Sequence, residues 1–270
     1  MAKVPFKPAL RKEYENLFNG CQVRPEQMDK VEGIITKLQA NKNRYQNVAG
    51  TLGIPWFFVA AIHNMESSLS FKRHLHNGDP LTKRTVHVPS GRPKKGNPPF
   101  TWEESAEDAL AMRGVGAKTD WSLAGTLYQL EGYNGWGYRL YHSHVLSPYL
   151  WGFSNHYKSG KYTADGTWSD VAVSKQCGAA VLLRRMAETN QIDFSDQPAL
   201  GPDAAPAIVS YSMAKPDDPA IVLRAEELQR WLNTFPGIFV KVDGIAGERT
   251  SEAYRKVTGS YLPGDPRTSA

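Results

Sequence analysis

The feature that most constrains this chain is a short segment that is apolar on every side. Residues 56–62 contain only Trp, Phe, Val, Ala and Ile, and Pro55 before them suits the first position of a helix. A helix without a polar face cannot rest on a protein surface, so other elements must surround it. The pattern therefore predicts a buried helix over residues 54–65, with Glu66 at its C-terminal end.

Most of the remaining periodicity is helical as well. Further helices are expected over residues 25–45, 120–133, 169–188 and 248–257. Thr101, with Glu104 three positions later, fits a capping box at the start of another helix. Residues 74–99 are punctuated by Gly, Pro, Asn and Asp, which predicts loops around one short β-hairpin. The predicted fold class is mainly α, with a small β-hairpin in an α+β first domain.

The composition changes once along the chain. Between residues 192 and 219 it shifts to Pro, Ala, Asp and Ser, which is typical of a linker. A stripe of apolar residues at helical spacing follows, formed by Leu228, Trp231, Leu232 and Phe235. We therefore expect a first domain over 1–195, a linker over 196–220 and a small domain of three helices over 221–262.

Charge and apolar content limit the class of partner. The 270 residues carry 32 Lys or Arg and 27 Asp or Glu, a net charge of +5 that suits an anionic polymer. No dense basic run with interleaved aromatic residues occurs, so no nucleic acid partner is expected. No stretch approaches the roughly 20 apolar residues of a membrane span, so no stable membrane insertion is expected. The N-terminus has no apolar segment typical of a secretory signal. A monomer is expected.

The two cysteines lie far apart in the sequence. Cys21 and Cys177 have no metal-ligand spacing, and a disulfide between them is allowed but not implied. Buried free thiols are the favoured interpretation, because unpaired Cys behaves as a small apolar residue.

The C-terminal segment carries the most specific motif. Residues 228–233 read L-Q-R-W-L-N and residues 242–250 read V-D-G-I-A-G-E-R-T. The pair closely resembles the small helical peptidoglycan-binding domain, in which an L-Q-x-x-L helix leads into a V-D-G-x-x-G-x-x-T turn. The resemblance implies a wall-binding role to which Trp231 and Asp243 contribute. The alternative is that Asp243 and the two glycines only shape the turn.

A second resemblance involves the residue at the end of the apolar helix. Residues 63–71 read H-N-M-E-S-S-L-S-F, similar to the E-S-S-F signature of the lysozyme-like superfamily, especially soluble lytic transglycosylases and goose-type lysozymes. There a Glu ends a buried helix beside the substrate cleft and precedes a β-hairpin. The resemblance implies that Glu66 is the catalytic acid and that Ser67 contacts substrate.

Two further segments resemble the same enzymes. Residues 130–137, L-E-G-Y-N-G-W-G, look like their A-Y-N-A-G motif, with Gly-Trp in place of Ala-Gly. This implies that Tyr133 and Asn134 offer hydrogen bonds to the sugar. Tyr149 and the aromatic residues of 157–162 are candidates for the last wall of the cleft, with core packing as the alternative for each ring. Residues 74–102 resemble a phage and bacterial group of lysozyme-like proteins that carry H-L-H-N-G-D-P-L-T and G-R-P segments.

Glycosidic cleavage needs a protonated group near the leaving oxygen, and a Glu against apolar side chains has the raised pKa that this requires. A second carboxylate decides the chemistry, and Asp79 is the candidate that favours hydrolysis. Glu103 is a weaker candidate, and Thr82 or Thr85 could hold a water. If none acts, Glu66 serves as acid and then base, and the 6-hydroxyl of muramic acid attacks, as in lytic transglycosylases.

For His63 a core role is the favoured interpretation. His63 lies one turn before Glu66, and tuning of Glu66 is the alternative to a core role. The spacing of His74, His76 and Asp79 could hold a metal, but neither a metal nor a cofactor is expected, because lysozyme-type chemistry needs none.

Together the motifs predict cleavage of the β-1,4 bond between MurNAc and GlcNAc in bacterial peptidoglycan. With no visible signal peptide, the favoured setting is a phage endolysin that stays in the host cytoplasm until release to the wall. A bacterial autolysin or a delivered effector is the alternative setting. The alternative functions are lytic transglycosylation, chitin cleavage and wall binding without catalysis.

Overall fold

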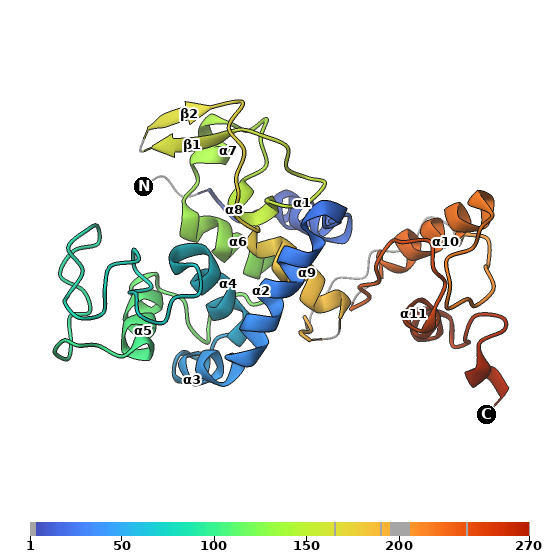
Figure 1. The fold of residues 1–270 in the computed structure, drawn as a ribbon, viewed down its shortest axis with the longest axis horizontal. Coiled ribbons are helices and arrows are strands. Elements are labelled where there is room, and N and C mark those ends of the chain that lie inside the picture. Colours follow the sequence, from blue (N-terminus) through green and yellow to red (C-terminus); the bar gives the residue numbers. More distant parts are fainter. Residues whose placement is uncertain (1–3, 165, 190, 195–205, 236, 270) are drawn as a thin grey trace.

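The computed structural model describes residues 4–164, 166–189, 191–194, 206–235 and 237–269, and the protein is mainly helical (Figure 1). The helices up to residue 194 are α1 (Pro8–Asn19), α2 (Met28–Ala40), α3 (Lys42–Leu52), α4 (Trp56–Ser67), α5 (Trp102–Met112), α6 (Leu123–Asn134), α7 (Gly137–Tyr141), α8 (Pro148–Trp151) and α9 (Ala179–Glu188). Strands β1 (Lys161–Ala164) and β2 (Thr167–Ser169) pair in antiparallel fashion. After them come α10 (Pro219–Leu232) and α11 (Glu248–Thr258), and two 3-10 turns, η1 (Pro25–Gln27) and η2 (Pro266–Ser269), complete the elements of the described residues.

The apolar helix lies at the centre of the larger hydrophobic cluster. Ten of the twelve residues of α4 are buried, and the helix packs against α3, α6 and α9. The prediction of a buried helix with Glu66 near its C-terminal end is therefore confirmed, although the helix runs from Trp56 to Ser67 rather than over residues 54–65. Pro55 is its N-cap rather than its first residue. Burial on all sides replaces the polar face that a surface helix would need.

Other helix predictions hold with changed limits. The capping box between Thr101 and Glu104 is present at the start of α5. The helix expected over 25–45 is divided into η1, α2 and the start of α3, and the one expected over 169–188 is confined to α9. Helix α1 was not predicted. No single described helix has the length and apolar content of a membrane span, although α3 and α4, bent by 114°, pass that test as a pair.

The β-hairpin prediction was wrong in its location. Residues 74–99 contain no strand, and the paired strands are β1 and β2, about sixty residues further on by the sequence numbering. Five prolines of this range lack the N–H groups that a ladder needs: Pro80, Pro89, Pro93, Pro98 and Pro99. The amides of Val86 and His87 instead donate to the side chain of Asp79. Side-chain hydrogen bonds therefore shape this loop.

The C-terminal residues form a second hydrophobic cluster. Its buried members are Val209, Ala225, Leu228, Leu232, Ile238, Val240, Ala246, Ala253 and Leu262. The described residues of 221–262 form two α-helices, α10 and α11, where three helices were expected. Val209 belongs to the cluster although it falls in the predicted linker, and the amide of Tyr211 donates to the carbonyl of Pro263. Residues 195–205 of that linker lie outside the described residues.

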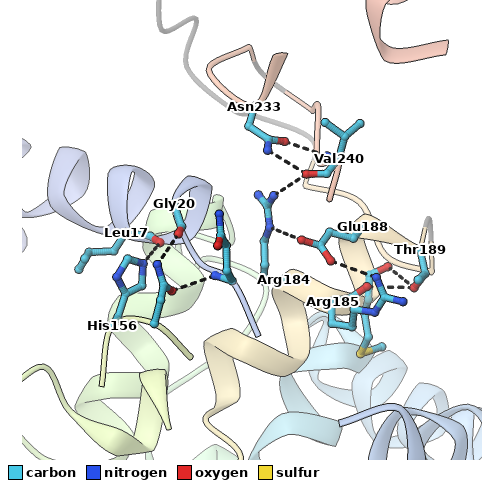
Figure 2. Close-up of polar contacts among 12 residues, drawn as sticks. Leu17, Gly20, His156, Arg184, Arg185, Glu188, Thr189, Asn233 and Val240 are labelled. Atoms are coloured by element: carbon cyan, nitrogen blue, oxygen red, sulfur yellow. Dashed lines mark hydrogen bonds and ion pairs between the residues drawn. The ribbon is translucent and has the colours of Figure 1, made fainter. Parts of the chain in front are cut away.

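One aromatic residue joins the two clusters. Phe239 packs edge-on against Phe18 and Phe194 of the first cluster, with ring centres 5.5 and 6.1 Å away. Beside it the buried guanidinium of Arg184 pairs with Glu188 and donates to the carbonyl of Val240, as Figure 2 shows. A cavity of about 360 Å³ at this junction is lined by charged side chains of α9 and α11. The C-terminal unit therefore contacts the larger one through both apolar and polar groups.

Both cysteines are buried and free, as expected. Burial raises the pKa of the Cys21 thiol to about 12 and also raises that of Cys177. A buried, protonated thiol is a poor nucleophile, so neither cysteine has the chemistry of a reactive site.

Candidate active site

Glu66 ends α4 and meets a tyrosine from α8. The hydroxyl of Tyr149 donates a hydrogen bond of 2.8 Å to Oε1 of Glu66. Burial raises the pKa of Glu66, and the Tyr149 hydrogen bond and the positive charge of Arg113 only partly oppose this. Burial and the charge of Glu66 raise the pKa of Tyr149 well above 10, so the phenol keeps its proton. Glu66 therefore holds a proton to higher pH than an ordinary glutamate does.

Tyr133 and Arg113 lie beside this pair. Tyr133 is buried at the end of α6, and its hydroxyl donates to the carbonyl of Leu75. The charge of Glu66 reaches Tyr133 and adds to the effect of burial in raising the pKa of its phenol. The guanidinium carbon of Arg113 lies 4.4 Å from the Tyr133 ring centre. The structure thus brings together Glu66, Tyr133 and Tyr149, and it adds Arg113, for which the sequence offered no signal.

The chain turns sharply after Glu66. Ser68 and Leu69 have φ angles of 50° and 61°, in the left-handed region, and neither is a glycine. Each such residue costs on the order of 1 kcal/mol, and residues of this kind concentrate at functional sites. The Ser67 hydroxyl donates to the carbonyl of His63, and the Gln176 side chain donates to that of Met65. These contacts hold the helix end rigid, and contact of Ser67 with a substrate stays a prediction.

Removing the Tyr149 hydroxyl tests this geometry. In Tyr149→Phe the carboxylate of Glu66 loses the hydrogen bond that lowers its pKa, so that pKa should rise further. The expected result is an upward shift of the Glu66 pKa, seen in an NMR titration of its labelled carboxyl. Tyr138→Phe is the matched control, since the Tyr138 phenol is also buried but interacts with Tyr157 and Tyr162 rather than with Glu66. An unchanged or lower pKa in Tyr149→Phe would contradict the assigned hydrogen bond.

Asp79 occupies a different environment. Its Oδ1 accepts from Nδ1 of His87 at 2.6 Å, and its Oδ2 accepts from the amides of Val86 and His87. Burial raises its pKa, but these hydrogen bonds outweigh burial and lower the pKa to about 2. Both oxygens are therefore engaged within the loop, an arrangement that suits a structural role. A catalytic role for Asp79 stays a prediction that needs its own test.

Asp79→Asn separates the two roles. Asn keeps one carbonyl oxygen for the loop amides but cannot serve as a carboxylate in catalysis. We expect the variant to retain, within about tenfold, any activity that depends on Glu66, whereas loss of a catalytic carboxylate costs about 10²- to 10⁴-fold. In Asp79→Ala the amides of Val86 and His87 lose their acceptor, and their hydrogen exchange should accelerate. Near-complete inactivation of Asp79→Asn with an intact loop would instead make Asp79 catalytic.

The other acidic and hydroxyl candidates are engaged elsewhere. Glu103 forms a two-bond pair with Arg44, at 2.7 and 3.0 Å. Glu104 caps α5. Thr85 is buried, and its hydroxyl donates to the carbonyl of Pro89. None of these contacts leads to Glu66.

The histidines have partners that fit a structural role. Nδ1 of His63 lies 3.0 Å from the Tyr45 hydroxyl, and burial lowers the pKa of His63 to about 4, so the ring is neutral. The ring of His74 contacts Ser105 and the carbonyl of Lys83, and that of His76 pairs with Asp108. In the part of the chain that the structure describes, no group of three His, Cys, Asp or Glu side chains could hold a metal ion.

Three predicted binding residues lie away from Glu66 or face solvent. Asn134 is exposed at the end of α6. Trp231 packs on Phe235 with ring centres 4.7 Å apart, and Asp243 accepts hydrogen bonds from Gln229 and the amide of Ile245. The last two residues therefore serve the C-terminal fold, and their contact with a wall polymer stays a prediction.

Comparison with protein-family models, with curated proteins and with solved structures gives no match for this chain.

Proposed function

We propose that this protein cleaves the glycan strands of bacterial peptidoglycan at the MurNAc–GlcNAc β-1,4 bond, with Glu66 as general acid. The observation that carries the proposal is the half-buried Glu66, whose carboxyl pKa is raised by removal from water and whose Oε1 accepts a hydrogen bond from the Tyr149 hydroxyl. A protonated carboxyl near neutral pH is what the departing sugar oxygen needs. The lysozyme-like fold of the larger unit is part of the same proposal, supported by the Glu at the end of a buried helix.

The hydrogen bonds of Asp79 favour transglycosylation over hydrolysis. A carboxylate whose two oxygens accept three hydrogen bonds is poorly placed to activate a water. Glu66 then acts twice: it protonates the leaving oxygen, and its carboxylate afterwards takes the proton of the muramic acid 6-hydroxyl as that oxygen bonds to C1. The product is a 1,6-anhydro end. Hydrolysis, with water in place of the 6-hydroxyl, is the alternative, and it gives a reducing end.

The C-terminal unit is proposed to hold the enzyme on the wall. The support is the motif of residues 228–250. The side chain of Gln229 forms hydrogen bonds with Asp243 and Gly244, and these bonds fix the turn of the motif. Binding through a second unit raises the local concentration of substrate for the first. The proposed setting is a phage endolysin in the host cytoplasm before release, with wall binding without catalysis as the alternative function.

Product analysis tests the proposal. Purified peptidoglycan sacculi and chitin oligosaccharides are incubated separately with the protein. The masses of the soluble products are then measured by mass spectrometry. We expect muropeptides with 1,6-anhydro ends from sacculi and little release from chitin. If the products carry reducing muramic acid ends instead, the reaction is hydrolysis and not transglycosylation. No soluble product from sacculi, with protein still sedimenting with them, would leave wall binding as the function.

A further inference from the structure

The positive charge of this protein is concentrated in one loop. Residues 72–95 contain seven Lys or Arg residues and one acidic residue, Asp79, a formal charge of +6, while the whole chain carries +5. The rest of the protein is therefore close to neutral. Figure 1 shows the segment between α4 and α5 extending away from the helical body. The base of this loop lies beside the candidate active site, because Gly78 is next to the backbone carbonyl of Glu66.

Hydrogen bonds close the end of this loop into a defined apex. The amide of Thr85 donates to the carbonyl of Arg92 at 2.8 Å, and the amide of Arg92 donates to the Thr85 hydroxyl at 2.9 Å. The amide of Gly91 donates to the carbonyl of Thr85. Residues 86–91 therefore form the tip of a closed loop, which Asp79 further fixes through His87 and Val86.

The apex presents apolar side chains to solvent. Val86 is 71% exposed and Val88 is 89% exposed, and Pro89 follows them. A loop that only connects helices would carry polar residues at such positions, because exposed apolar groups gain nothing from water. Here several hydrogen bonds hold two valines outward, so the apex is organised to present them.

Lysines flank the apex on both sides. Lys83 precedes the closure at Thr85, and Lys94 and Lys95 follow the closure at Arg92; all three are exposed. Within the described residues no ion pair involves them, whereas Arg92 pairs with Asp108 and Arg84 donates to the carbonyl of Gly96. The arginines are thus used to build the loop, and the lysine charges remain available to an external partner.

We propose that the loop of residues 83–95 docks on the surface of an anionic lipid bilayer, with Val86 and Val88 entering the interface and the three lysines contacting headgroup phosphates. An apolar apex with a basic flank matches a surface that is apolar beneath and anionic above. A hydrophilic polyanion would satisfy the lysines but leave both valines in water. This surface is separate from glycan cleavage and does not depend on Glu66 being catalytic.

Vesicle sedimentation tests the docking surface. The full-length protein is mixed with vesicles of phosphatidylcholine alone or with one quarter phosphatidylglycerol. We expect binding only to the anionic vesicles, and weaker binding when salt shortens the Debye length from about 10 Å at 0.1 M to about 3 Å at 1 M. Lys94→Gln with Lys95→Gln should weaken binding about 25-fold, or about fivefold per charge. Val86→Ser with Val88→Ser should weaken it about tenfold.

Matched variants control for general effects of charge and apolar surface. Val171→Ser with Val173→Ser alters two other exposed valines, and Lys118→Gln with Lys158→Gln removes two other exposed lysines. Both controls, and Glu66→Gln, should bind anionic vesicles as the wild type does. Absence of binding to anionic vesicles, or equal losses in the control and loop variants, would overturn the proposal.

The test also separates lipid from a soluble polyanion. Long-chain polyphosphate is used as a competitor and as a ligand in its own right. For lipid docking, both the lysine and the valine variants lose affinity for vesicles, and the valine variant keeps the wild-type affinity for polyphosphate. If the valine variant binds vesicles as the wild type does while only the lysine variant loses affinity, the loop is a polyanion site and the lipid proposal is wrong.

Discussion

Glu66→Gln is expected to reduce release of soluble muropeptides from sacculi about 1,000-fold, while binding to sacculi stays unchanged. The amide cannot transfer a proton to the leaving oxygen, and removal of a general acid typically costs about 10²- to 10⁴-fold. Gln has the size of Glu and can still accept the hydrogen bond from Tyr149, so the site should keep its shape. Turbidity of sacculi and mass spectrometry of the supernatant measure the loss.

Thermal stability distinguishes loss of the acid from loss of the fold. The pKa of Glu66 is raised in the folded protein, so the folded state binds the Glu66 proton more tightly than the unfolded state does. Below the ordinary pKa near 4.5 the carboxyl is protonated in both states and costs no stability; at higher pH its ionisation destabilises the fold. Glu66→Gln removes this cost, so its Tm should exceed the wild-type Tm at pH 7, and the difference should vanish below about pH 4.

A matched control comes from the neighbouring acids. Glu107→Gln changes a half-buried glutamate on α5 and should leave both activity and Tm unchanged. Wild-type activity in Glu66→Gln would remove Glu66 from the mechanism. A lower Tm at pH 7 would mean that the ionised carboxylate stabilises the fold, which contradicts the burial argument.

The sequence predicted the parts of the site that depend on local pattern. The seven apolar residues 56–62 require burial wherever they lie, so helix α4 and the environment of Glu66 followed from them. Tyr133 and Tyr149 were identified through motif resemblance, and the structure places both beside Glu66. Their placement could not come from spacing, since residue 149 lies far from residue 66 in the chain.

What the sequence missed depends on tertiary contacts. Helix α1 was not predicted, and it is held by Tyr14, whose hydroxyl donates to the buried Glu131 at 2.5 Å across 117 residues. Arg139 pairs with the same carboxylate. The glutamate of the L-E-G-Y-N segment is thus a structural group, which no local pattern distinguishes from a catalytic one. Arg113 joins the site by packing on Tyr133, a contact that its neighbours in sequence do not encode.

The loop of residues 74–99 shows why the hairpin was misplaced. Its Gly, Pro and Asn residues indicate turns correctly, but turn signals do not distinguish a β-ladder from a loop fixed by side chains. Asp79 takes the hydrogen bonds that a partner strand would have taken. The resulting order is non-repetitive, so periodicity could not reveal it.

The second large effect is expected at Gln229, which organises the C-terminal motif. Its side chain is 1% exposed; its amide nitrogen donates to Asp243, Ile245 and Thr250, and its oxygen accepts from the amides of Asp243 and Gly244. Gln229→Ala leaves buried donors and acceptors without partners at about 1–3 kcal/mol each, and the costs are not additive. We expect the C-terminal unit to lose about 3–5 kcal/mol of its free energy of unfolding.

Hydrogen exchange over residues 209–262 measures this loss, with Glu227→Ala, at an exposed position of the same helix, as the control. In the Glu66→Gln background, which prevents cleavage, Gln229→Ala should also lose sedimentation with sacculi if the C-terminal unit is what holds the wall. Exchange should stay slow around α4, because Phe239 is the only described C-terminal residue that belongs to the hydrophobic cluster of α4. If the double variant still sediments with sacculi although its C-terminal unit is unfolded, the larger unit binds the wall. The motif of residues 228–250 would then carry a structural role alone.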